Sequence, residues 1–487
     1  MDFQLSDLYT LLPEIFLLVG VSGILLLDLF LSKEQRGITY GLSLVVLIVT
    51  SVLPWFFYDA DPRVIMSGLV VSDLLGAALK STVCVLVAVG LVYSKSYLLS
   101  RGLHRGEYFS LTLFATLGMM VMISSNHFLS LYLGLELLSL SLYAMVALQR
   151  DSGRSSEAAI KYFVLGAIAS GMLLYGMSMI YGGTGHLNIE AIVSSVLSGQ
   201  SDSNLLRLGV VFVIVGIGFK LGAVPFHMWI PDVYHGSPTS VTLLIGTAPK
   251  VAAFAFVLRL LAEALGHPSL HQDWSQMLTV LAVGSLVIGN VVAIAQTNFK
   301  RMLAYSTIAH MGFLLVGFMT GSINGYSASL FYILTYVLMA LGGFGVILIL
   351  SRDGFESEEL SDLKGLSQTN PWCAFLLMII LFSMAGIPPT VGFWSKLFVI
   401  QSIIDLGYVG LAVTAVMTSL IGAFYYLRVV KIMYFDASDS SSINTTKYSP
   451  GMAVFAINGL LLLGLGLFPG WLLSLCESLI ESSVRTF

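Results

Sequence analysis

Runs of about 20 apolar residues recur along the whole chain, and few folds can accommodate them. A helix that crosses the hydrocarbon core of a bilayer needs about 20 mostly apolar residues. Only 10% of the 487 residues are charged, far below the roughly 25% of soluble domains. The sequence therefore predicts an all-α polytopic membrane protein. We expect about 14 transmembrane helices, at residues 8–31, 37–57, 70–97, 107–125, 127–148, 156–181, 205–230, 238–265, 274–296, 300–320, 325–350, 372–404, 407–434 and 451–475.

Lys and Arg are distributed unevenly between the loops. Loops on the cytoplasmic side of a membrane carry an excess of both residues. The side of the chain opposite to the odd-numbered loops, termini included, has only Arg63, Arg207 and Arg485. The odd-numbered loops are those that follow odd-numbered spans. The other Lys and Arg residues that indicate the orientation lie in or beside them: Lys33, Arg36, Arg101, Arg105, Arg150, Arg154, Lys300, Arg301, Arg352, Lys364, Arg428, Lys431 and Lys447. These loops are predicted to face the cytoplasm, and both termini the outer side.

Two of the long apolar segments are interrupted by a similar motif. Span 7 contains Gly222-Ala-Val-Pro225 and span 12 contains Gly386-Ile-Pro388-Pro389, five spans later. A unit of five helices enters its second copy from the opposite side of the membrane, and interrupted helices at matching positions point to a transporter's site. We therefore predict two inverted five-helix repeats, spans 4–8 and 9–13, with broken helices 7 and 12. Kinked helices without a repeat are the alternative.

The repeats divide the chain into four parts. These are the N-terminal helices 1–3 (1–106), the first repeat (107–265), the second repeat (274–434) and a C-terminal helix 14 (451–487). The short segment 188–199 is predicted to lie at the membrane interface, and loop 352–371 to be a solvated acidic loop.

A few ionisable residues lie deep inside the apolar runs. Such residues face the interior of a helix bundle or water, and they often mark ion or proton paths. Four of them, counted by helical rise, fall near the membrane midplane: Glu136, Lys220, Lys250 and His310. The broken span 12 carries Lys396, span 6 carries Lys161, and His227 follows Pro225 in span 7. These seven residues are the candidate proton-translocation site.

The prolines connect these charges to the backbone. Pro225 leaves the carbonyl of Leu221 without its helical partner, and Pro389 does the same for Ala385. Exposed backbone at membrane depth persists only where protein or trapped water satisfies it. Burial disfavours the charged form of a lysine and a nearby carboxylate favours it, so a lysine whose acid partner moves can act as a proton switch.

Structural interpretations compete with this one. Glu136 and Lys220 could form a static pair that only fixes packing, His310 could bind Ser306 one turn earlier, and Lys161 could extend toward the cytoplasmic side. The other charged residues near the apolar runs are expected to be interface, helix-end or contact residues: Glu14, Asp28, Asp73, Lys80 and Arg259.

The sequence carries no complete motif for the other chemistries considered below. Cys84, Cys373 and Cys476 are scattered, with no C-x-x-C, so neither a disulfide framework nor an iron–sulfur site is indicated. The chain has no P-loop, no complete dinucleotide fingerprint and no histidine pair with metal or haem spacing. The net charge of −4 gives no nucleic-acid footprint. The sequence indicates a chain that moves something without performing redox chemistry.

Four ordered runs carry a resemblance to a known family: "FKLGAVPFHMWIPDVYHGSPT" (219–239), "KRMLAYSTIAHMGF" (300–313), "ELSDLKGL" (359–366) and "GIPPTVGFWSKL" (386–397). They resemble the antiporter-like subunits of respiratory complex I, NADH:quinone oxidoreductase. The end of the chain after span 14, Lys396 in span 12 and "PDVYHGSPT" resemble the N-type (subunit-2) members. His235 departs from that pattern, which more often has an acidic residue there.

The resemblance implies a proton-translocating subunit in the bacterial inner membrane. Glu136 and Lys220 would be the modulating pair, Lys250 the central relay and Lys396 the terminal exchange site, with Lys161, His310 and His227 auxiliary. No cofactor is expected in this chain, because NADH, FMN, iron–sulfur clusters and quinone (ubiquinone) would sit on other subunits. The expected partners are neighbouring antiporter-like and small membrane subunits and the lipid bilayer. The alternative is a subunit of a multi-subunit Na⁺/H⁺ antiporter.

The charge distribution predicts a testable topology. Tags at both termini should be labelled from the outer face, and a tag in loop 352–371 only from the cytoplasm. Impermeant reagents applied to intact cells and to inverted vesicles make this measurement. Labelling of the two termini from opposite sides would show that the number of spans is odd.

Overall fold

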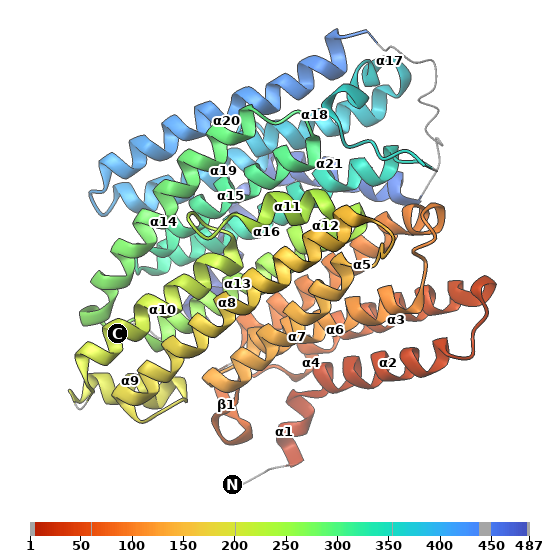
Figure 1. The fold of residues 1–487 in the computed structure, drawn as a ribbon. Helices are drawn as coiled ribbons and strands as arrows, with labels where there is room; N and C mark the ends of the chain where they lie inside the picture. Colours follow the sequence, from red (N-terminus) through yellow and green to blue (C-terminus); the bar gives the residue numbers. More distant parts are fainter. Residues whose placement is uncertain (1–4, 60, 200, 353, 438–449, 485–487) are drawn as a thin grey trace.

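The fold was obtained as a computed structural model that describes residues 5–59, 61–199, 201–352, 354–437 and 450–484. Lys447 and Arg485, used above for orientation, lie outside the described residues. The helices and strands (Figure 1) are α1 Leu5–Thr10, α2 Leu12–Asp28, α3 Gly37–Val52, α4 Pro54–Phe57, β1 Arg63–Ile65, β2 Val70–Ser72, α5 Leu74–Ser100, α6 Gly106–Ser124, α7 Phe128–Val146, α8 Gly153–Thr184, α9 Ile189–Leu197, α10 Ser203–Leu221, α11 Trp229–Gly236, α12 Thr239–Gly246, α13 Ala248–Val257, the π-helical turn η3 Leu258–Ala264, α14 Pro268–Ile294, α15 Phe299–Phe318, α16 Ile323–Leu350, the 3₁₀ turn η4 Leu360–Leu363, α17 Leu366–Thr369, α18 Pro371–Ala385, α19 Val391–Ile404, α20 Val409–Phe435, α21 Pro450–Leu467 and α22 Pro469–Ser483.

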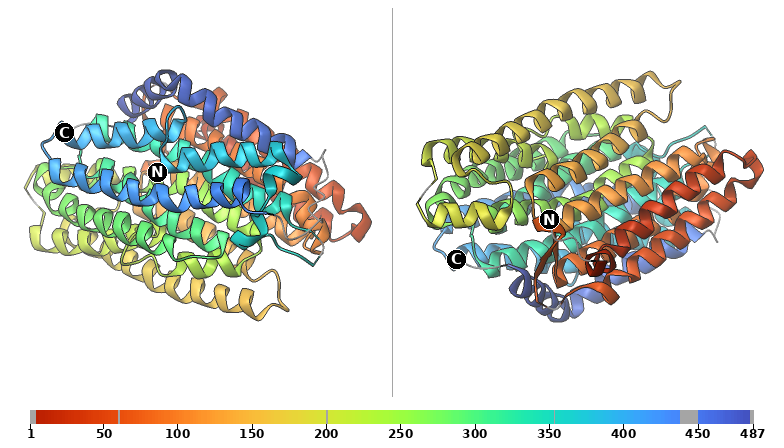
Figure 2. Two further views of the ribbon diagram at one scale, coloured as in Figure 1. Left: turned by 90° about the horizontal axis from the view of Figure 1, so that it is seen from above. Right: turned by 90° about the horizontal axis from the view of Figure 1, so that it is seen from below.

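The long helices run side by side along one direction, as Figures 1 and 2 show from three sides. In the described part of the chain, 12 helical segments are long and apolar enough to cross a membrane. The predicted span 1 corresponds to α2, which has 17 residues, and span 12 to the shorter apolar helices α18 and α19. The all-α polytopic fold is confirmed, whereas the count of 14 spans and the inverted repeat stay predictions.

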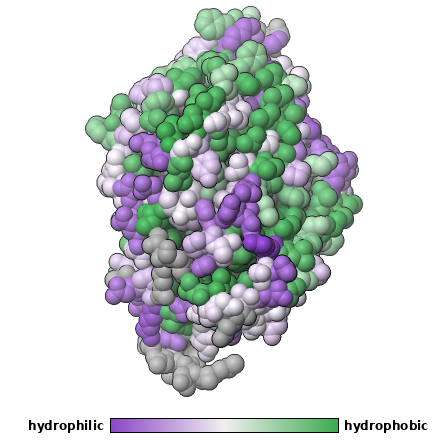
Figure 3. Space-filling view, turned by 90° about the vertical axis from the view of Figure 1, so that its left-hand side faces the viewer, coloured by the Kyte–Doolittle hydropathy of each residue, from purple (hydrophilic) through white to green (hydrophobic). Residues whose placement is uncertain are grey.

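Apolar side chains cover much of the outside as well as the core. On α8, for example, Phe163 and Ile168 are more than half exposed. Figure 3 shows a face on which hydrophobic residues cover the upper and right-hand parts, while hydrophilic residues gather toward the middle and left. A soluble protein rarely leaves so much apolar surface in contact with water, so this surface suits lipid or neighbouring subunits.

Helix α16 and the α12–α13–η3 segment form the centre of the bundle. Helix α16 packs against α5, α12, α13, α15, α18, α19, α21 and α22, so it contacts elements from all four predicted parts of the chain. Every residue in the most apolar 18-residue window of Thr239–Ala264 is buried. The candidate Lys250 is therefore carried by one of the most enclosed segments of the protein.

Both predicted broken helices are present, and they break in the same way. α10 ends at Gly222 (φ +76°) and α18 at Gly386 (φ +85°), a left-handed conformation that favours glycine. In each case the next N–H turns back onto the helix: Ala223 N–H donates to Gly218 O and Ile387 N–H to Phe382 O. The peptide bonds before Pro225 and Pro389 are cis.

Other boundaries differ from the predictions. Span 14 was expected to be continuous over 451–475, but the helix stops at Leu467 and α22 begins at Pro469. Span 8 is divided at Thr247, two residues before a proline that would have signalled the break. The start of span 3 is not helical, because 70–72 pairs with 63–65 in an antiparallel hairpin. The segment 188–199 contains the nine-residue α9, too short to span, as predicted.

The loop expected to be solvated is a structural junction at one end of the bundle. Glu356 accepts hydrogen bonds from Tyr97 and Thr239 and lies 3.4 Å from Lys300 Nζ. Glu358 lies 3.0 Å from Arg154 Nη1 and 3.7 Å from Lys300 Nζ. Lys300 is only 1% exposed and donates to the backbone carbonyl of Ser237. We call this set the Glu356 junction: Tyr97, Arg101, Arg154, His235, Thr239, Lys300, Glu356 and Glu358.

The junction places loops after spans 3, 5, 7, 9 and 11 at the same end of the molecule. The opposite end brings together the β1–β2 hairpin, α9, η3 and the end of α22 around a pocket. The odd-numbered and even-numbered loops are thus separated, as the predicted alternation requires. Which end faces the cytoplasm stays a prediction.

The Glu356 junction makes stability depend on one carboxylate. Burial raises the pKa of Glu356, but the charges of Lys300 and Arg101 and the donated hydrogen bonds outweigh it and hold the pKa below its ordinary value. Its stabilising contribution is therefore complete above the ordinary glutamate range and is lost as pH falls through the lower, folded-state pKa.

We predict that Glu356→Gln lowers the stability of the purified complex by about 1–3 kcal/mol, because buried Lys300 loses a charged partner. Thermal unfolding at neutral pH measures this. The pair Lys431–Asp436, whose lysine side chain is 63% exposed, offers a control, since Asp436→Asn should change stability by less than about 1 kcal/mol. An equal effect of the two variants would contradict the role of the junction.

Candidate functional site

Glu136 and Lys220 lie on helices of the first predicted repeat, where serines bind both of them. Lys220, the next-to-last residue of α10, donates from its Nζ to Ser139 Oγ at 2.6 Å. Ser139 follows Glu136 by three positions on α7, so both lie on one face of that helix. Glu136 accepts a hydrogen bond from Ser170 of α8. Among the described residues no ion pair joins Glu136 to Lys220, and in this structure the two side chains bind different serines.

One cavity contains both Lys220 and Lys250. Its wall includes Ser139, Tyr162 and Trp229, from α7, α8 and α11. Lys250 Nζ lies 5.6 Å from the centre of the Trp229 ring, and the Trp229 indole N–H donates to Phe219 O at 3.0 Å. The aromatic ring can stabilise the ammonium through its π face. The structure thus brings the first two predicted lysines to one enclosed space.

The two most buried candidate lysines satisfy the broken backbone. Lys250 Nζ donates to Leu221 O at 3.1 Å, and Lys396 Nζ donates to Ala385 O at 2.8 Å. These are the two carbonyls that the prolines were predicted to leave without helical partners. Each ammonium therefore compensates a polar backbone group that hydrocarbon could not solvate. Lys250 comes from a different helix, whereas Lys396 reaches back from the second half of its own broken helix.

Lys396 has a second polar neighbour and a second cavity. Its Nζ also donates to Ser419 Oγ of α20 at 2.9 Å and lies 5.4 Å from the centre of the Phe313 ring. The cavity beside it is lined by His310 and Tyr426, among others. His310 bonds to Tyr332 and Tyr426, not to Ser306 as the structural alternative proposed. The structure thereby groups Lys396 and His310.

Lys161 and His227 lie outside these two cavities. Lys161 Nζ is 2.8 Å from both Glu157 and Asp232, and its side chain is 43% exposed. Asp232 also pairs with Arg301 at 3.0 Å. These contacts agree with the alternative that Lys161 extends to the surface. His227 lies between α10 and α11, and its buried Nδ1 has no hydrogen-bond partner among the described residues.

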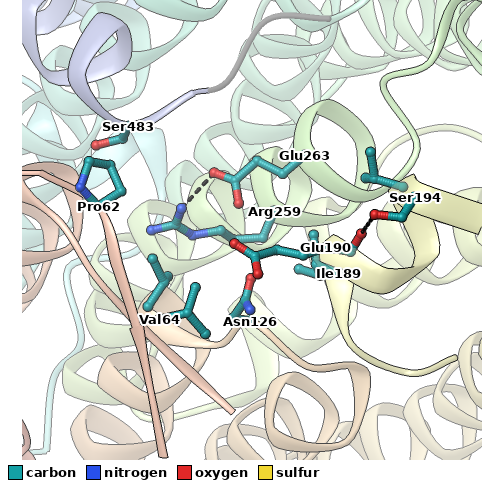
Figure 4. A pocket seen from close by; sticks show the side chains of 11 residues that line it. Pro62, Val64, Asn126, Ile189, Glu190, Ser194, Arg259, Glu263 and Ser483 are labelled. Atoms are coloured by element: carbon teal, nitrogen blue, oxygen red, sulfur yellow. Dashed lines mark hydrogen bonds and ion pairs between the residues drawn. The ribbon is translucent and has the colours of Figure 1, made fainter. Parts of the chain in front are cut away.

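Four of the five charges set aside as interface, helix-end or contact residues form buried pairs within the chain. Lys80 Nζ is 2.5 Å from Glu14, and Arg259 Nη2 is 2.6 Å from Asp73. Arg259 also pairs with Glu263 at the pocket between the hairpin, α9 and η3 (Figure 4). The charged groups of Asp73 and Lys80 thus bind partners within the chain. Each of these buried charges has an opposite charge close by, and removing one partner would leave the other charge buried and uncompensated.

No cluster of three His, Cys, Asp or Glu side chains suited to a metal ion occurs in the part of the chain that the structure describes. The three cysteines are buried and unpaired, in agreement with a packing role.

Known proteins resemble this chain over nearly its full length. A family model described as "NADH:quinone oxidoreductase/Mrp antiporter, TM" matches residues 125–422. The NADH-quinone oxidoreductase subunit N of Nitrosomonas europaea is 55% identical over 99% of this chain and 100% of that protein. The subunit of the same name from Thiobacillus denitrificans is 54% identical, covering 99% of both chains.

The chain belongs to the NADH:quinone oxidoreductase/Mrp antiporter family of membrane subunits.

Solved structures agree with the membership. A chain of respiratory complex I from Thermus thermophilus is 32% identical, with a TM-score of 0.80, covering 95% of this chain and 98% of that one. A chain of the Mrp complex from Dietzia has a TM-score of 0.78 at 21% identity, covering 98% and 97%, which shows a shared fold alone. The predicted resemblance is confirmed, including its N-type assignment.

Sequence reasoning did not find the neutral partners of the lysines. Ser139, Ser419 and Tyr426 hold or face the charged groups, but serines and tyrosines are common in membrane helices and carry no distinctive spacing here. Trp229 could have been noticed, because it follows the break in span 7 within the quoted motif.

The break in span 12 yields a prediction. Gly386 has a φ of +85°, and a Cβ there would lie 2.9 Å from Lys396 Cδ. Gly386→Ala should therefore cost roughly 1–2 kcal/mol in stability and displace Lys396, reducing proton pumping. Gly410→Ala is the control, because that helical position has no atom within 4 Å of the new methyl group. Unaltered pumping in Gly386→Ala, with a stable complex, would show that the break does not position Lys396.

Proposed function

We propose that this chain is the proton-translocating N-type subunit of a bacterial NADH:quinone oxidoreductase, embedded in the inner membrane. The observation that carries the proposal is the series of buried lysines held against broken backbone and polar cavities. NADH, FMN, iron–sulfur clusters and quinone would be bound by other subunits of the complex. Both termini would face the periplasm, as the loop charges predict.

Membership of the family supports the function, and the site supports the residues. Full-length relatives above 50% identity carry the name of this oxidoreductase subunit. The alternative, a subunit of a Na⁺/H⁺ antiporter, shares the fold, but the Mrp neighbour is only 21% identical. A carboxylate and a series of buried lysines suit proton transfer, because each lysine can gain or lose one proton.

The geometry suggests how the first half works. In this structure Lys220 is bound to Ser139, three positions from Glu136 on the same face of α7. A small side-chain rotation would bring the Glu136 carboxylate to Lys220 and favour its charged form. When the carboxylate turns back to Ser170, Lys220 can release its proton into the cavity that Lys250 shares. Lys250 would be the central relay, and Lys396 the terminal exchange site.

The energetic demand is modest. Moving one elementary charge through 100 mV requires about 2.3 kcal/mol. A change of one pKa unit corresponds to about 1.4 kcal/mol. A switch in one carboxylate–lysine pair is therefore of the right size to drive a proton against the membrane potential.

We predict that Lys220→Arg abolishes pumping in the assembled complex, because arginine keeps its charge and cannot release a proton. Glu136→Ala should lower pumping and quinone reduction together, whereas Glu136→Asp should keep part of both. Acidification of the periplasmic side and NADH oxidation are measured in membrane vesicles. The exposed Lys431→Arg serves as the control, and its activity should be normal.

Full pumping by Lys220→Arg would leave Glu136 and Lys220 as a static pair and refute the switch. Lys396→Ala is the companion test: loss of the terminal site should stop pumping although Glu136 and Lys220 are intact. Assembly is checked by the subunit content of the purified complex.

A further inference from the structure

A chain of four hydrogen-bonding groups lies buried beside Lys396. Ser306 Oγ bonds to the Tyr426 hydroxyl, which lies 3.2 Å from His310 Nε2, and His310 Nδ1 lies 2.6 Å from the Tyr332 hydroxyl. None of the four residues is more than 3% exposed. They come from α15, α16 and α20, so the chain crosses the second predicted repeat rather than following one helix.

Every member of this chain can both donate and accept a hydrogen bond. A hydroxyl has one proton and two lone pairs, and a neutral imidazole carries its proton on either nitrogen. All the hydrogen bonds can therefore be donated in the direction from Ser306 to Tyr332, with His310 Nδ1 protonated. They can equally be donated in the direction from Tyr332 to Ser306, with His310 Nε2 protonated. Both orientations use every contact observed. Passage of one proton along the chain converts one orientation into the other.

These hydrogen-bonded side chains share a cavity with the charged group of Lys396. Tyr426 and His310 line the cavity that also contains Lys396 and Ser419. Ser419 and Tyr426 are seven residues apart on α20, which places them two turns apart on one helix face. Lys396 binds Ser419 at one end of this stripe. Because a lysine side chain has four rotatable carbons, its ammonium can move along the cavity wall toward Tyr426.

We propose that Tyr426 transfers protons between Lys396 and His310, as a further catalytic residue that deepens the proposed function and rests on it. The Lys396 ammonium gives a proton to the Tyr426 oxygen while the Tyr426 hydroxyl proton passes to His310 Nε2. Lys396 ends as a neutral amine, the imidazole of His310 ends as an imidazolium, and Tyr426 ends with one proton as it began. His310 then holds the proton as an imidazolium, and the reverse transfer through Tyr426 returns it to Lys396.

A structural role would give different behaviour. If these hydrogen bonds only hold α15, α16 and α20 together, removing any nearby buried hydroxyl should lower proton pumping only by lowering the stability of the protein. Tyr336 provides the matched control. It is 1% exposed and its ring lies 5.2 Å from that of His310. Its hydroxyl donates to Thr307 Oγ1, which is not one of the four hydrogen-bonded groups. Tyr336→Phe and Tyr426→Phe each remove one hydroxyl and keep the ring.

The experiment compares these variants with Lys396→Ala in vesicles containing the assembled complex. Tyr426→Phe should lower NADH-driven proton pumping by tenfold or more, a moderate loss for a positioned proton-transfer group that typically contributes about 10²–10⁴-fold. The solvent deuterium isotope effect on the residual rate should rise, because proton transfer becomes limiting. Tyr336→Phe should pump within about twofold of the unmodified complex, and the thermal midpoints of both tyrosine variants should be similar.

The outcomes separate the two proposals. Normal pumping in Tyr426→Phe with lost pumping in Lys396→Ala overturns the tyrosine relay and leaves the proposed function standing. An equal loss in both tyrosine variants, with lowered thermal midpoints and an unchanged isotope effect, also overturns the relay. Normal pumping in Lys396→Ala overturns the role of Lys396 in the proposed function, and the relay with it.

Discussion

The fold depends on hydrogen-bond partners for two backbone carbonyls inside the membrane. In hydrocarbon every peptide group needs a partner within the protein. The chain breaks two helices at membrane depth, at Gly222 and Gly386, and lysine ammonium groups then bind Leu221 O and Ala385 O. The lysines that we propose as proton carriers thus also satisfy the backbone at the breaks.

This double role constrains how a proton can leave. When Lys250 or Lys396 becomes neutral, its amine can still donate a hydrogen bond to the carbonyl. The backbone break therefore survives the loss of the charge, and the helices need not rearrange with every proton. Serines and aromatic rings around the ammonium groups offer neutral partners that tolerate both states. A permanent carboxylate at the same distance would have fixed the charged form.

The sequence predicted the helical architecture because length and hydropathy dictate it, and it located the broken helices because glycine and proline interrupt them at matching places. It also placed Lys220, Lys250, His310 and Lys396 in the interior. It could not supply their contacts, since these depend on which helices pack together. The Glu356 junction was missed for a related reason: an acidic loop looks solvated until the basic residues of four other loops or helix ends are brought to it. The breaks at Thr247 and Phe468 were overlooked although prolines follow them, because the apolar run continues on both sides of each break.

The Glu356 junction has a mechanical consequence. Many transporters alternate access by rocking one helical half against the other as rigid bodies. Here a single loop ties α5, α8, α11, α12 and α15 together at one end, and α16 packs against elements of both halves. Large relative motion would separate these charged groups from their partners. We therefore expect a stiff frame, in which rotations of individual side chains rather than of domains would open and close the proposed proton route.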